Sequence, residues 1–245
     1  MDVGEMLIVL AAIVIGSIIK AVTGMGLPLI AIPIAALFVD LDDAVVVIAL
    51  PNLLANAVLA TRERAARPET RDLPVLALFG IVGAIGGALA FVNLAEEPLV
   101  LLLIASIVGY VLVFFAAPDL RVDETTSRRW SPAVGAVAGA FQGAIGISGP
   151  VVGSWIHSYR LDRSAHVLSV TVLFFLTGAA QFAVLLVNGE LDGRVVATAL
   201  ACVPVLASIP VGTAIRDRMT SRAFDLSIIV LLVVSALALA IRTFT

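Results

Sequence analysis

The stretch Lys20–Pro28, Lys-Ala-Val-Thr-Gly-Met-Gly-Leu-Pro, places a positive charge and a helix break inside a long apolar region. Lys20 is the single lysine of the chain and stands between the apolar runs Met6–Ile19 and Leu27–Val39. An ionisable side chain at membrane depth normally faces a cavity or a partner. The glycines and the proline break a helix there, and broken backbone survives inside a bilayer only where protein or a water-filled cavity covers it. Lysine and break therefore predict one binding site.

The composition is that of a polytopic membrane protein. The 245 residues are 61% hydrophobic and 13% charged, with a mean hydropathy of +1.13, whereas soluble domains are about half apolar and about a quarter charged. Apolar spans and short connections use up this length, and the chain has no Gly-x-x-x-x-Gly-Lys-Ser/Thr phosphate loop. This excludes ATP-driven transport by this chain alone and leaves secondary transport or facilitated flow.

The order of apolar segments predicts an all-α fold made of two similar halves. A transmembrane helix needs about 20 residues, and the two broken segments fit hairpins of two half-helices better than plain spans. We expect a broken hairpin at 6–39 with spans at 44–60, 73–92 and 98–117, then a broken hairpin at 132–159 with spans at 164–187, 195–215 and 224–241.

The two breaks are themselves similar. Gly24–Pro28 superimposes on Gly146–Pro150 at an offset of 122 residues, which places Lys20 over Gln142. Paired segments interrupted by glycine and proline are typical of transporters built from repeats, and they indicate where the substrate binds.

The arginines predict how the halves are oriented. Twelve of the fourteen arginines fall in four connections, which the positive-inside rule places in the cytoplasm, whereas the acidic connections at Asp40, Glu96 and Glu190 go outside. Each half then crosses the membrane an odd number of times, so the repeats are inverted. The expected organisation is a first transmembrane repeat at 1–117, a cytoplasmic linker at 118–131 and a second transmembrane repeat at 132–245.

The chemistry of the breaks favours a small oxyanion. A helix begins just after each pair of glycines, and helix N-termini attract anions. Thr23 and Ser148 add hydroxyl groups, Lys20 adds a full charge, and no carboxylate is expected to be embedded in the membrane. The predicted substrate-binding residues are Lys20, Thr23, Gly24, Met25, Gly26, Asn52, Asn56, Gln142, Gly146, Ile147, Ser148, Gly149, Thr177 and Gln181.

Each of these residue types also has a purely structural interpretation. Lys20 could extend its side chain to the membrane interface. The amides and the hydroxyl of the full spans could serve only as hydrogen bonds between helices. Glycines at four-residue spacing, such as Gly135, Gly139 and Gly143, favour close helix packing over ligand contact.

Several motifs together resemble a known family. They are the Gly-x-Gly-x-Pro break at Gly24, the stretch Gly-Ala-Ile-Gly-Ile-Ser-Gly-Pro ending at Pro150, the basic linker, and Pro-Val-Gly-x-x-Ile-Arg-Asp-Arg over Pro210–Arg218. Over essentially its whole length the chain resembles the sulfite exporter TauE/SafE family, also called the 4-toluene sulfonate uptake permease family. The resemblance implies a permease for sulfite, sulfoacetate, other organosulfonates or related anions.

The resulting hypothesis is a multi-pass secondary transporter of the inner membrane that works by alternating access. A passive anion channel is the first alternative. An intramembrane enzyme is the second, and it is disfavoured because both histidines lie at one predicted edge and no acid is expected inside the membrane. The expected partners are a small anionic substrate, the lipid bilayer, a proton or sodium ion for coupling, and further copies in a homo-oligomer. No cofactor, metal or nucleic acid is expected.

Overall fold

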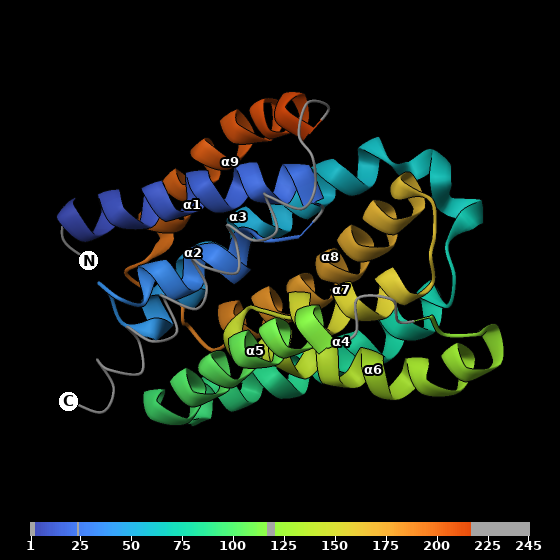
Figure 1. Ribbon diagram of the computed structural model, residues 1–245. Coiled ribbons are helices and arrows are strands. Elements are labelled where there is room, and N and C mark those ends of the chain that lie inside the picture. The colour runs from blue at the N-terminus through green and yellow to red at the C-terminus, as the bar shows by residue number, and fades with distance from the viewer. Residues whose placement is uncertain (1–2, 24, 117–120, 217–245) are drawn as a thin grey trace.

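The computed structural model describes residues 3–23, 25–116 and 121–216, and these are helical with no strand among them (Figure 1). Five of the described helices are long and apolar enough to cross a membrane, which confirms the all-α polytopic fold. The last expected span, at 224–241, lies outside the described residues. The elements are α1 (Val3–Thr23), α2 (Leu27–Ala35), α3 (Leu41–Arg62), the 3-10 helix η1 (Arg64–Glu69), α4 (Leu73–Asn93), α5 (Glu96–Ala116), α6 (Glu124–Ile145), α7 (Gly149–Ser158), α8 (Arg163–Val187) and α9 (Val195–Arg216).

The helices recur at a constant spacing along the chain. Helices α2, α3 and α4 begin at residues 27, 41 and 73, and α7, α8 and α9 begin at 149, 163 and 195, which is 122 residues later in each case. The ends of α1 and α6, at residues 23 and 145, are separated by the same interval. The offset found between the two breaks in the sequence therefore extends over most of both halves.

At both breaks the chain reverses direction through a glycine with positive φ. Gly26 has φ 122° and Gly146 has φ 71°, a region that side-chain-bearing residues rarely adopt. After the first turn Leu27 packs against Gly16, where an added Cβ would lie 2.7 Å from the Leu27 carbonyl oxygen. Each short helix therefore folds back from its break.

The first arm of each hairpin is longer than the half-helix expected from the sequence. Helix α1 has 21 residues and α6 has 22, about 31 to 33 Å at a rise of about 1.5 Å per residue, whereas α2 has 9 and α7 has 10. Helix α6 begins at Glu124, inside the expected linker, because the Asp123 carboxylate accepts a hydrogen bond from the Thr126 backbone N–H at 2.9 Å. Hydrogen bonds from Thr126 also hold the pKa of Asp123 below its usual value.

The long helices are arranged in a mirrored order. Helix α1 packs against α9, α9 against α3, α3 against α8, α8 against α4, and α4 against α6. Figure 1 shows α1 beside α9 at one side of the bundle and α4 with α6 at the other. The helices related by the 122-residue interval are α1 and α6, α4 and α9, and α3 and α8. If the two members of each pair are exchanged, the same series of contacts results, read in the opposite direction.

Polar connections gather into two groups. In the first, Arg194 pairs with Asp43 at 2.6 Å and with Glu190 at 3.5 Å, and the Leu41 N–H donates to Glu96 at 2.9 Å. All these residues belong to or adjoin connections expected outside.

The second group joins connections expected in the cytoplasm. The Arg71 guanidinium donates to the Ser127 hydroxyl at 2.6 Å and lies 4.6 Å from the Tyr159 ring centroid. The Tyr159 hydroxyl donates to Asp72 at 3.3 Å. These contacts tie the start of α4 to α6 and to the end of α7.

Candidate anion site

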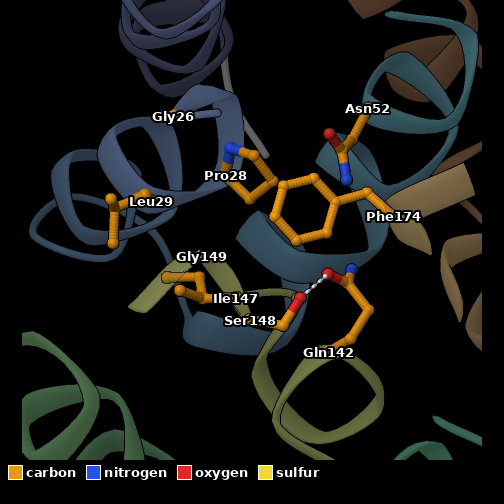
Figure 2. A pocket seen from close by; sticks show the side chains of 10 residues that line it. Gly26, Pro28, Leu29, Asn52, Gln142, Ile147, Ser148, Gly149 and Phe174 are labelled. Carbon is orange, nitrogen blue, oxygen red and sulfur yellow. Dashed lines mark hydrogen bonds between the residues drawn. The ribbon is translucent and has the colours of Figure 1, made fainter. Parts of the chain in front are cut away.

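The two breaks meet at a buried cavity. It measures about 10 Å³, about the room that one water molecule requires. Figure 2 shows Pro28 and Leu29 from one hairpin and Ile147, Ser148 and Gly149 from the other around it. The residues that line it are Gly26, Pro28, Leu29, Asn52, Gln142, Gly146, Ile147, Ser148, Gly149 and Phe174.

Both short helices begin at this cavity with the same local chemistry. The residue before each helix is Gly26 for α2 and Ser148 for α7, and each helix carries proline in its first turn. Proline fits the start of a helix, where its missing N–H loses no helical hydrogen bond. The remaining first-turn N–H groups have no intrahelical acceptor and carry the positive end of the helix dipole. The cavity is therefore polarised to receive negative charge.

A chain of hydrogen bonds fixes the side of the cavity formed by the second hairpin. The Ser148 hydroxyl donates to Gln142 Oε1 at 3.0 Å (dashed in Figure 2), and Gln142 Nε2 donates to Gln181 Oε1 at 3.1 Å. Gln181 Nε2 in turn donates to the Gly143 carbonyl oxygen at 3.2 Å. These side-chain donors are thus engaged with one another and with the backbone.

Lys20 is the unusual group of this region. Its side chain is 1% exposed, and its Nζ has no hydrogen-bond acceptor among the described residues. Its contact is with Phe174, whose ring centroid lies 5.3 Å from Nζ. A buried ammonium without an acceptor or counter-charge is strongly disfavoured. An anion that reaches Lys20 would supply both.

The asparagines of α3 lie as their spacing predicts. Asn56 Nδ2 donates to Asn52 Oδ1 at 3.3 Å, and both residues are buried. Asn52 lines the cavity, whereas Asn56 lies one turn further along and its Oδ1 has no partner among the described residues. The two asparagines therefore lie on one face of α3, and that face reaches the cavity at Asn52.

Two predicted site residues point elsewhere. The Thr177 hydroxyl donates to the Leu173 carbonyl oxygen of its own helix at 2.9 Å, and its methyl group packs where a Cβ on Gly80 of α4 would lie. Met25 places its sulfur against Gly153, where a Cβ would lie 2.6 Å away. Both contacts join helices, and neither residue lines the cavity.

The remaining predicted residues belong to the end of α1 and the turn after it. Thr23 is the last residue of that helix, and Gly24 lies outside the described residues.

Phe174 lines the cavity but is absent from the residues predicted from the sequence. A signal for it existed, because Phe174 stands 122 residues after Asn52, the interval that separates the two halves. The corresponding positions therefore carry an amide in the first half and an aromatic ring in the second, and both reach the cavity.

Comparison with known proteins supports the resemblance seen in the sequence. Residues 8–239 match the family described as Sulfite exporter TauE/SafE. No match to the chain is found among curated proteins or among solved structures. This family consists of membrane transporters, so the match supports a transport function. Because the match covers nearly the whole chain and agrees with an all-α membrane fold, the protein belongs to the sulfite exporter TauE/SafE family.

Proposed function

We propose that this protein is a secondary transporter that carries small sulfur-containing oxyanions, such as sulfite, sulfoacetate and other organosulfonates, across the inner membrane. The observation that carries the proposal is the Lys20 side chain. Its nitrogen is buried and has no acceptor among the described residues, and it lies near a cavity where two helices begin. Desolvating a charge costs several kcal/mol unless an opposite charge and hydrogen bonds compensate it. A small oxyanion provides both.

The groups around the cavity suit the distributed charge of such an anion. The N-termini of α2 and α7 offer backbone N–H groups, and Ser148 and Gln142 offer side-chain donors once their mutual hydrogen bond opens. Glycine at position 26 leaves the backbone within reach of a ligand because no side chain stands in the way. Several weak donors and one charge can thus share the anion's oxygens.

The size of the cavity favours a mechanism in which the site opens and closes. A sulfite ion, with three oxygens around sulfur, does not fit into about 10 Å³, which is about the room for one water. Binding then requires the walls to move. The mirrored helix contacts and the constant 122-residue interval support two inverted repeats that alternate around this site.

The orientation in the membrane is part of the proposal. The acidic and basic connections form two separate groups of contacts, as expected if each group lies at one membrane surface. The positive-inside rule then assigns the group around Arg71 to the cytoplasm.

A binding screen with the purified full-length protein tests the substrate class. We expect calorimetry to detect sulfite and sulfoacetate, and to detect taurine least, because the ammonium of taurine would be repelled by Lys20. Sulfate and thiosulfate complete the series, and their affinities show whether the shape or the charge of the anion determines binding. Absence of binding to every one of these anions would contradict the proposal.

Counterflow in proteoliposomes tests the transport mechanism. A carrier that alternates between two faces exchanges external labelled anion faster when unlabelled anion is trapped inside. A passive channel shows no such trans-stimulation. We expect stimulation, and equal uptake with and without trapped anion would favour the channel.

A further inference from the structure

Phe174 lies next to both the charge of this site and its cavity. The ring lies 5.3 Å from Lys20 Nζ and also lines the cavity, whereas Lys20 itself is not among the lining residues. Figure 2 shows the ring beside Pro28 and Asn52, above the hydrogen-bonded Ser148 and Gln142. The ring is therefore in reach of both an anion in the cavity and the Lys20 amino group.

The ring is a partial substitute for an anion. The negative face of an aromatic ring attracts a cation, and the attraction is strongest where water is excluded. Phe174 is 5% exposed and Lys20 is 1% exposed, so water does not compete for either group. In the described residues the ring is the contact that stabilises the ammonium, since Nζ has no hydrogen-bond acceptor there.

The ring and an oxyanion cannot both hold their places. The cavity has room for about one water, so an oxyanion that reaches Lys20 needs the volume that Phe174 occupies. The anion is also the stronger partner, because a full negative charge attracts the ammonium more than a ring quadrupole does.

We propose that Phe174 is the exchangeable partner of Lys20 that keeps the anion site closed: its ring holds the ammonium while the site is empty, and an entering oxyanion displaces it. This inference rests on the proposed anion site. In this role Phe174 lowers the affinity of the site for the anion. A residue that binds the anion directly would raise that affinity.

The pair of Lys20 and Phe174 is not repeated at the corresponding positions of the two halves. The positions 122 residues away from Phe174 and Lys20 hold Asn52 and Gln142, which are polar and line the cavity directly. The second half thus supplies the ring from α8 and the first half supplies the charge from α1, so the exchange links the two halves of the protein.

The test is a double-mutant cycle read out by sulfite binding to the purified full-length protein. Phe174→Leu removes the ring quadrupole and keeps an apolar side chain. A cation–π interaction of about 0.5–2 kcal/mol corresponds to about 2- to 30-fold in affinity. We expect Phe174→Leu to bind sulfite about 2- to 30-fold more tightly than wild type, because the empty site loses a stabilising contact that the bound site does not use.

Two further variants isolate the effect. Phe175→Leu is the matched control, because Phe175 is the next residue of α8, is half-buried and does not line the cavity; its affinity should equal that of wild type. In a Lys20→Met background, Phe174→Leu should change the residual affinity less than twofold. If Phe174→Leu folds poorly, Phe174→Met makes the same test with a longer side chain.

The outcomes separate this inference from the proposed function. Binding by Phe174→Leu that is equal to or weaker than wild type, or an equal gain with and without Lys20, would overturn the role of the ring while leaving the anion site intact. Absence of sulfite binding by wild type would instead overturn the proposed site, and the role of Phe174 with it.

Discussion

The packing of α4 on α6 permits a quantitative test. An added Cβ on Gly139 would lie 2.0 Å from the Gly80 carbonyl oxygen and 2.8 Å from the Ala84 nitrogen. Ordinary van der Waals contact at such a position is 3.4–4 Å, so Gly139→Ala must move the helix backbones apart by about 1.4 Å. Overpacking of a close-packed interior typically costs about 1–3 kcal/mol. Because the contacted atoms belong to the backbone and cannot rotate away as side chains do, we expect the upper end of this range. Gly139→Ala should lower the free energy of unfolding by about 3 kcal/mol.

The assay is thermal unfolding in detergent, followed by size-exclusion chromatography of the heated protein. Gly86→Ala is the matched control, because Gly86 lies in the same helix pair and an added Cβ there meets nothing within 4 Å. We expect Gly86→Ala to equal or slightly exceed the wild-type stability, since alanine favours a helix over glycine by about 1 kcal/mol. If Gly139→Ala melts no lower than Gly86→Ala, the close approach of these two helices is refuted.

Three further predictions address the site, the orientation and the Tyr159 contacts. Lys20→Ala should weaken sulfite binding about 10- to 100-fold, from the about 1.5–3 kcal/mol of a charged hydrogen bond, with unchanged thermal stability; wild-type affinity in calorimetry would remove the lysine from the site. In a Cys202→Ala background, Glu97→Cys and Thr125→Cys, both exposed, should react with an impermeant maleimide from opposite membrane faces, and labelling from one face would contradict the inverted repeats. Burial raises the pKa of Tyr159, so its hydroxyl stays protonated and donates to Asp72; Tyr159→Phe should lower the free energy of unfolding by about 1.5 kcal/mol, and denaturant titration with unaltered stability would argue against this contact.

The sequence alone predicted the features that depend on local properties of the chain. Hydropathy identified the spans because the bilayer requires long apolar helices. Glycine followed by proline marked both breaks, because positive φ at Gly26 and Gly146 and proline in the next turn cannot continue a helix. The interval of 122 residues, read from one pair of motifs, recurs at every later pair of described helix starts.

The lengths of the hairpin arms are less evident from the sequence. The sequence predicts a half-helix on either side of the glycines after Lys20, whereas α1 has 21 residues and runs up to Thr23. The helix before the second break, α6, has 22 residues because it begins inside the expected linker. A glycine in the sequence shows that a helix can end there, but the helix length is set by how much apolar surface its neighbours cover.

Only the tertiary structure decided which polar groups are available to a ligand. Gln142 and Ser148 satisfy each other, Thr177 bonds within its own helix, and Lys20 has no acceptor among the described residues. Nor could the sequence show that Phe174, on a distant helix, meets that lysine. A residue's type fixes which hydrogen bonds and charges it can offer. Whether they are satisfied depends on what the other helices place within about 3 Å of it, and that is determined by packing between helices.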